Sequence, residues 1–259
     1  MTAGETGMLR FQIPCTKDVA VSVGFRGPSA SFLAGPDMSD FATARQRMVD
    51  GQVRTSDVTD NRILDAMLTL PREEFVPDDK RALAYLDLDL DVAASGAASR
   101  FLVKPALTAK LLQAAEILET DSVLVVGAAT GYAAAVAARL AGKVRATESD
   151  PALITKGKEI FGRLGLADKV TFQAAEAAAG DPTGAPYDVI ILNGATEVVP
   201  DKLYAQLRDG GRLLGVFATT RPPRAMIVRR SHGDFGIRPL FDAAAPVLPG
   251  LERAPAFVF

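Results

Sequence analysis

The stretch Val123-Leu-Val-Val-Gly-Ala-Ala-Thr-Gly-Tyr132 decides the fold. It reads as a short buried strand, a turn that carries two glycines, and the start of a helix. Gly127 allows a sharp turn where a side chain would clash, and Gly131 lets a ligand approach the backbone at the start of the helix. The spacing is G-x-x-x-G, which lacks the middle glycine of the dinucleotide fingerprint G-x-G-x-x-G. Alone, this turn indicates either ligand binding or close packing of the strand on the helix.

Strands and helices alternate after this stretch. The predicted strands are residues 122–126, 144–147, 170–173, 189–192 and 212–217, and the predicted helices are residues 131–140, 151–164 and 200–207. Residues 226–229 and 256–259 read as late strands at an antiparallel edge. The alternation predicts an α/β fold with a doubly wound, mostly parallel sheet and helices on both faces.

A helical region comes before the alternating part. Apolar residues recur at helical spacing from Ser39, and a second helix begins at Thr59 or Asp60 and stops at Pro71. A third helix runs from Pro105 to about residue 118. Between them, residues 86–92 alternate apolar and acidic residues, which predicts a half-buried strand with aspartates on its solvated face.

These patterns predict three parts of the chain. Residues 1–37 show no sustained period, and we expect a poorly ordered extension there. Residues 38–120 form the helical region on the substrate side, and residues 121–259 form the cofactor-binding α/β domain.

Composition narrows the classes of function. The 259 residues include 29 basic and 31 acidic ones, so the net charge of −2 gives no reason to expect a nucleic-acid partner. Cys15 is the only cysteine and His232, in a Ser-His-Gly-Asp turn, is the only histidine, so we expect no disulfide and no Cys/His metal site. No apolar run approaches the ~20 residues of a membrane span. We therefore expect a cytoplasmic protein without a membrane partner, as a monomer or weak dimer.

Polar residues follow the later strands at the edge where such sheets bind ligands. Glu148 follows the second strand, where a carboxylate accepts both hydroxyls of a ribose, and the alternative is a helix cap before Pro151. Glu176 follows the third strand, where it is placed to meet the amino group of an adenine or to be solvated. Asn193 ends the fourth strand and faces the expected cleft. Together these turns predict adenosine binding, and the expected cofactor-binding residues are Gly127, Ala129, Gly131, Tyr132, Glu148, Ser149, Glu176 and Asn193.

The chain resembles the protein-L-isoaspartate O-methyltransferase family over roughly residues 39–215. The matching segments are Arg47-Met-Val-Asp-Gly-Gln-Val-Arg54, Pro71-Arg-Glu-Glu-Phe-Val-Pro77, Ala84-Tyr85, the turn at residues 127–132, Pro186-Tyr-Asp188 and Leu207-Arg-Asp-Gly-Gly-Arg-Leu213. The resemblance implies a Rossmann-like class I methyltransferase fold, S-adenosyl-L-methionine as methyl donor, and a carboxylate of damaged aspartyl residues in a protein or peptide as acceptor. Such an acceptor is already ionised at neutral pH, so the reaction requires no general base, and we assign no catalytic residue.

The chain departs from the family at Val125 and Ala129 of the cofactor turn, at Ala175-Glu176, and most of all in one loop. The family's substrate loop reads Gly-Gln-Thr-Ile-Ser-Gln-Pro, whereas this chain has Ser99-Arg-Phe-Leu-Val-Lys-Pro105. Val103 takes the position of the family's active-site serine, and Arg100 or Lys104 is available to bind an anionic group of a substrate. The alternative function is therefore a methyltransferase-like protein that has another acceptor, or that acts as a non-catalytic cofactor-binding or interaction module.

Overall fold

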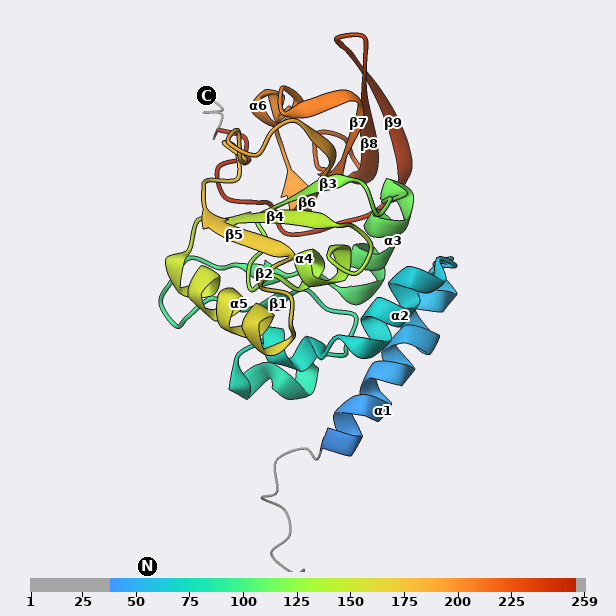
Figure 1. Ribbon diagram of the computed structural model, residues 1–259, viewed down its shortest axis with the longest axis vertical. Helices are drawn as coiled ribbons and strands as arrows, with labels where there is room; N and C mark the ends of the chain where they lie inside the picture. The colour runs from blue at the N-terminus through green and yellow to red at the C-terminus, as the bar shows by residue number, and fades with distance from the viewer. Residues whose placement is uncertain (1–37, 255–259) are drawn as a thin grey trace, which may run out of the picture. The chain divides into compact units, whose positions relative to one another are not determined.

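A seven-stranded sheet in the order β5-β4-β3-β6-β7-β8-β9 forms the centre of the computed structural model, which describes residues 38–254 (Figure 1). The strands are β3 (Ser122–Val126), β4 (Lys143–Glu148), β5 (Val170–Ala174), β6 (Tyr187–Thr196), β7 (Leu207–Phe217), β8 (Arg224–Ser231) and β9 (Asp234–Asp242). They are parallel from β5 to β7, and β8 and β9 continue the sheet as an antiparallel meander. The predicted doubly wound, mostly parallel sheet is confirmed.

Successive side chains of β3 and β6 point to opposite faces of the sheet, so each strand contributes to the core on both faces. Val123 and Val125 pack into one apolar cluster, and Leu124 and Val126 pack into a second cluster on the other face. All four side chains are fully buried. An all-apolar strand of this kind belongs in a sheet that is covered on both sides.

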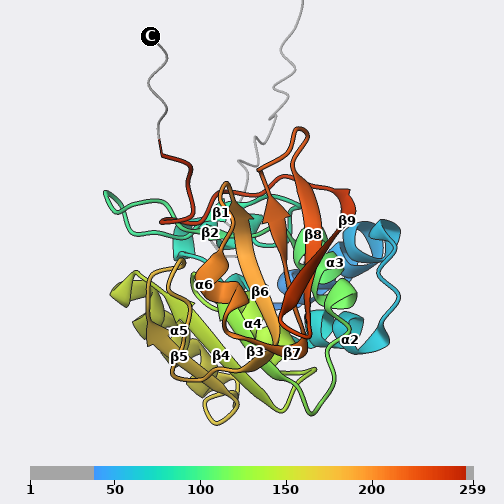
Figure 2. The same cartoon turned by 90° about the horizontal axis from the view of Figure 1, so that it is seen from above.

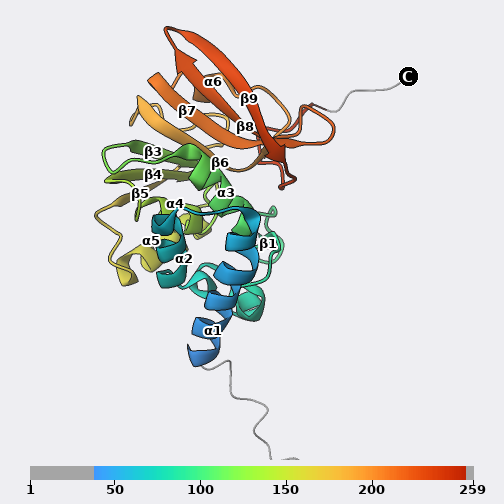
Figure 3. The same ribbon diagram turned by 90° about the vertical axis from the view of Figure 1, so that its right-hand side faces the viewer.

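Helices α1 to α5 lie on one side of the sheet and the short α6 (Asp201–Tyr204) lies on the other, as Figures 1 and 3 show. The first five are α1 (Met38–Met48), α2 (Asn61–Thr69), α3 (Pro105–Ala115), α4 (Tyr132–Ala137) and α5 (Pro151–Arg163). Helix α5 lies at the β5 end of the sheet, and α1 and α2 lie at the β9 end (Figure 2). The second face is covered mainly by α6 and the segment after β9.

Capping contacts confirm the predicted starts of α2 and α5, whereas α4 ends at Ala137 instead of residue 140. Asp60 caps α2 by accepting the N–H of Arg62, and Asp150 caps α5 by accepting the N–H groups of Ala152 and Leu153. After α1 the chain stays helical through a π-helical turn (η1, Val49–Val53) and a 3₁₀ turn (η2, Arg54–Ser56).

The predicted strand at residues 86–92 is wrong for most of its length. Only Leu90–Asp91 (β1) is extended, paired with Phe101–Leu102 (β2). Asp87 and Asp89 accept the N–H groups of Ala106 and Lys104 at the start of α3. The period of two arose from aspartates that cap a helix rather than from a pleated strand.

Other boundaries also differ from the sequence prediction. Helix α3 ends at Ala115 because Glu116 is left-handed, which leaves Leu118 58% exposed rather than inward. The helix predicted at residues 200–207 is only α6. Strand β9 was missed because its exposed residues show no apolar alternation. His232 lies in the exposed turn between β8 and β9, as predicted.

The extension predicted at residues 1–37 and the strand predicted at residues 256–259 lie outside the described residues. Residues 38–120 and the described part of 121–259 belong to one compact unit. The division into a substrate-side region and a cofactor domain stays a prediction. Among the helices of residues 38–254, none combines the length and the apolar character that a bilayer crossing requires.

Two glycines of α5 provide a stability test. A Cβ on Gly157 would strike the Phe172 ring and lie 2.8 Å from the carbonyl oxygen of Thr130, whereas a Cβ on Gly162 meets nothing within 4 Å. We expect Gly157→Ala to lower the free energy of unfolding by about 1–3 kcal/mol through overpacking. Gly162→Ala should raise it by about 0.5–1 kcal/mol through helix propensity. Urea denaturation measures both, and equal effects would contradict the packing of α5 on β5.

Candidate active site

The turn after β3 is held in an unusual backbone conformation beside β4. Gly127, Ala129 and Gly131 all have positive φ, of 65°, 52° and 97°. The N–H of Ala128 donates to the carbonyl oxygen of Thr147, 2.9 Å away. A left-handed alanine is unfavourable, so the surrounding contacts must maintain it.

One of those contacts comes from Glu148, whose side chain is only 1% exposed at the end of β4. Its Oε2 accepts the N–H of Ala129 at 2.9 Å, and its Oε1 accepts the N–H groups of Ser149 and Asp150 at 2.8 and 3.2 Å. The carboxylate therefore joins the β3 turn to the β4 turn. Hydrogen bonds from N–H groups to a carboxylate are stronger than those between neutral groups, so this contact fixes the relative positions of the two turns.

Arg100, from the end of the loop between β1 and β2, covers this carboxylate. Its Nε lies 2.9 Å from Oε1 of Glu148 and its Nη2 lies 2.7 Å from Oγ of Ser149. The guanidinium side chain is 12% exposed. Glu148 is thus paired with a cation of the substrate loop, an arrangement that no sequence pattern indicated.

Asn193 lies on the other side of the turn, where its Nδ2 donates to the carbonyl oxygen of Gly127 at 2.9 Å. Next to it the chain after β9 returns across the end of β6, and we name residues 245–251 the strap. The strap is bonded to Ala195, whose N–H donates to Pro246 and whose carbonyl accepts from Leu248. Leu248 packs directly on Gly127, where a Cβ would clash with it.

Arg100 and the strap fill the space above the β3 turn. The cavity that remains between Arg100, Gly127, Asn193 and the strap is about 10 Å³. That is barely the volume of one water molecule, whereas pockets for small organic ligands measure roughly 300–1,000 Å³. Sequence reasoning missed the strap because Pro-Val-Leu-Pro-Gly (246–250) has neither helical nor strand periodicity.

The predicted residues divide into two groups. Gly127, Ala129, Glu148, Ser149 and Asn193 are linked by the hydrogen bonds above, and the exposed Glu176 follows in the turn after β5, where Ala175 N–H donates to Glu148 O. Gly131 and Tyr132 turn toward the core instead. A Cβ on Gly131 would meet the Phe161 ring, and the Tyr132 ring packs at 5.3 Å from the Phe75 ring.

Residues 71–77 fasten the helical region to this site. Arg72 is fully buried and donates to the carbonyl oxygens of Ala84 and Val103, both at 2.8 Å, while its guanidinium lies over the Tyr132 ring at 4.7 Å. Burial lowers the pKa of Arg72 and raises the pKa of Tyr132 to about 12. The carbonyl oxygen of Phe75 accepts the hydroxyl of Thr130 at 2.6 Å. This motif is therefore a brace between the substrate loop and the β3 turn.

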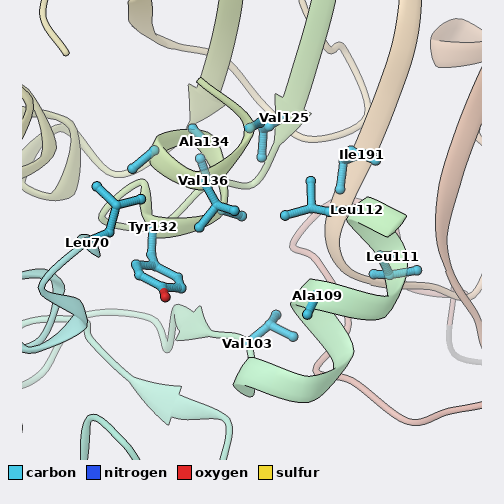
Figure 4. Close-up of a cluster of buried hydrophobic side chains, with 14 of the residues drawn as sticks. Leu70, Val103, Ala109, Leu111, Leu112, Val125, Tyr132, Ala134, Val136 and Ile191 are labelled. Carbon is cyan, nitrogen blue, oxygen red and sulfur yellow. The ribbon is translucent and has the colours of Figure 1, made fainter. Parts of the chain in front are cut away.

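Val103 points into the core rather than into the cleft. Its side chain is 3% exposed and lies among Ala109, Tyr132 and other apolar residues (Figure 4). A hydroxyl at this position would be buried among apolar groups. Arg100 is therefore the residue of the loop whose side chain reaches Glu148.

A second cavity, of about 630 Å³, opens between the loop at residues 91–97, residues 76–80 and the first turn of α5. Thr130 lines it, but none of the predicted cofactor residues does. Within residues 38–254, no three His, Cys, Asp or Glu side chains are placed to hold a metal ion.

Comparison with known proteins gives the family. Residues 43–240 match the family described as protein-L-isoaspartate(D-aspartate) O-methyltransferase. A protein-L-isoaspartate O-methyltransferase of Roseiflexus sp. is 35% identical over 195 residues, which cover 75% of this chain and 86% of the relative. One of Koribacter versatilis is 34% identical over 200 residues, which cover 77% of this chain and 88% of the relative.

Solved structures agree with the sequence relatives. A protein-L-isoaspartate O-methyltransferase superposes with a TM-score of 0.71 at 25% identity, covering 80% of this chain and 67% of that one. A Plasmodium falciparum structure described as the same type of enzyme, in complex with S-adenosyl-L-homocysteine, has the same fold with a TM-score of 0.66 at 15% identity, covering 79% and 97%. With its turn, its strand order and these matches, the chain belongs to the protein-L-isoaspartate(D-aspartate) O-methyltransferase family.

Proposed function

We propose that this chain transfers the methyl group of S-adenosyl-L-methionine to the carboxylate of an isoaspartyl residue in a protein, and that it does so in the cytoplasm. The carboxylate of Glu148 carries the proposal. It stands at the carboxyl end of β4 and is bonded to the β3 turn, the position at which α/β sheets of this kind hold the ribose of a nucleotide cofactor. Family membership supports the same donor and acceptor.

The chemistry of the residues fits this cofactor. Glu148 and the hydroxyl of Ser149 would hold the ribose hydroxyls, and Glu176 lies next along the edge for an adenine amino group. Gly127 and Asn193 would meet the amino-acid end, because they border the turn on the β6 side. Ala129, Gly131 and Tyr132 would contribute their backbone. The space for these contacts is filled by Arg100 and Leu248, which must move aside.

The chain's part in the reaction is to align the two reacting groups and to exclude water from the site. When bound, the cofactor supplies a methyl group on a positively charged sulfur. The acceptor carboxyl has a pKa of about 4, so it is ionised and nucleophilic at neutral pH, and no side chain has to remove a proton. What remains is to hold two groups in line in a dry site, which is a task of proximity and orientation.

Cofactor binding is tested with S-adenosylhomocysteine and calorimetry. We expect the protein to bind it, and Glu148→Ala to weaken binding roughly tenfold or more, because a hydrogen bond to a charged group contributes about 1.5–3 kcal/mol. Glu159→Ala, which removes an exposed carboxylate of α5, should leave the affinity unchanged. An absence of heat at millimolar ligand would overturn cofactor binding and favour a non-catalytic interaction module.

The acceptor is tested with matched peptides. Radiolabelled methyl should enter a peptide that contains one isoaspartyl residue, and much less should enter the same peptide with a normal aspartyl residue. The two peptides differ only in the position of this carboxylate, and the proposed substrate has it in the isoaspartyl position. Equal labelling of the two peptides would overturn the isoaspartyl assignment and leave a methyltransferase with another acceptor.

Substitutions of Val103 test whether this position of the loop is structural or contacts the acceptor. Because Val103 is buried, Val103→Ser should lower the free energy of unfolding more than Val103→Ala does, by about 1–2 kcal/mol for the unpaired hydroxyl. Neither variant should increase methyl transfer. A gain of activity in the serine variant alone would show that this side chain reaches the acceptor.

A further inference from the structure

The ion pair between Arg100 and Glu148 occupies the position that the proposed cofactor needs. Arg100 bonds both Glu148 and Ser149, the two residues assigned to the ribose, at 2.9 and 2.7 Å. The cavity beside it measures about 10 Å³. A ribose therefore reaches Glu148 only after the guanidinium has left.

The backbone of Arg100 is fixed, so its side chain is the part that moves. The N–H of Arg100 donates to Oδ1 of Asp91 at 3.2 Å, and its carbonyl oxygen accepts the N–H of Val92 at 2.7 Å. The next residue, Phe101, pairs with Asp91 in the small β1–β2 sheet. Release of Glu148 is then a change of rotamer that leaves the loop in place.

Once released, Arg100 lacks a carboxylate. The other hydrogen-bond partners of its guanidinium among the described residues are the hydroxyl of Ser149 and the carbonyl oxygen of Ser99. In the pair the Arg100 side chain is 12% exposed, and a guanidinium in so little water loses its carboxylate partner when Glu148 turns to the ribose. The acceptor brings a carboxylate to this cleft, and the planar guanidinium matches that group in geometry as well as in charge.

We propose that Arg100 exchanges carboxylates: it releases Glu148 to the cofactor and takes the carboxylate of the acceptor. Arg100 is thus a positioning residue that selects acceptors bearing a free carboxylate, and it delays their binding until the cofactor is in place. Val103, which takes the position of the family's serine, is buried in the core. It is therefore not available to contact the acceptor, which leaves this role to Arg100. This inference rests on the proposed function: its cofactor half on the ribose position at Glu148, and its acceptor half on the isoaspartyl acceptor.

The cofactor half is tested by calorimetry with S-adenosylhomocysteine alone. Arg100→Gln removes the competing cation and should tighten binding about threefold to tenfold, the size of a partly exposed ion pair. Arg224→Gln is the matched control, because Arg224 forms an exposed pair with Asp242 between β8 and β9, and it should leave the affinity unchanged. Unchanged or weaker binding by a folded Arg100→Gln protein overturns the exchange.

The acceptor half is tested by steady-state methyl transfer. Arg100→Gln should raise KM for an isoaspartyl peptide at least about tenfold while changing kcat less, and Arg100→Lys should recover part of the loss. A purely structural role would lower the melting temperature and kcat and leave KM unchanged, which would overturn the acceptor role. If Arg100→Gln does not fold, Arg100→Lys decides between the two by the same KM comparison.

The two proposals fail in different ways. If the wild-type protein methylates no isoaspartyl peptide, the proposed function and the acceptor half are overturned together. The calorimetric comparison still decides the cofactor half, because it requires no acceptor. Tight binding by Arg100→Gln together with an unchanged KM would restrict Arg100 to a competitor of the cofactor and overturn the exchange.

Discussion

The buried carboxylate of Glu148 is the contact on which the arrangement of the site depends. It accepts N–H groups from the β3 turn and from the residues that start the β4 turn, so it fixes two neighbouring strand ends with one side chain. The left-handed backbone at Ala129 is maintained in part by this bond. Because parallel strands end at the same edge, one carboxylate there determines where a ligand can lie.

A second set of contacts connects this edge to the helical region. Arg72 bonds Val103, and Thr130 bonds Phe75, so the substrate loop and the β3 turn are held by the same short motif. A fully buried arginine is costly unless its donors are satisfied, and two of its three nitrogens have carbonyl partners. The motif therefore has a structural reason to be present, independent of any contact with substrate.

The sequence predicts those elements whose pattern of apolar residues directly reflects burial. The strand at residues 122–126 is predicted to the residue because it is buried on both faces, and the start of α2 is predicted at Thr59 or Asp60 because capping chemistry is local. Residues 86–92 misled because helix-capping aspartates also recur every second residue. The pairing of Arg100 with Glu148 and the position of Leu248 on Gly127 depend on contacts far apart in the chain, which no local pattern encodes.

The strap bears on how fast a ligand enters and leaves the site rather than on how tightly it binds. It is bonded to the backbone of Ala195 in β6 and of Glu197 just after β6, and Leu248 and Leu251 are buried in the second apolar cluster. Leu248 lies directly on the face of Gly127, so a ligand reaches that face only after Leu248 is displaced. The bonds that hold Leu248 there therefore oppose entry and exit alike, and a segment held in this way acts on the rates of binding and release.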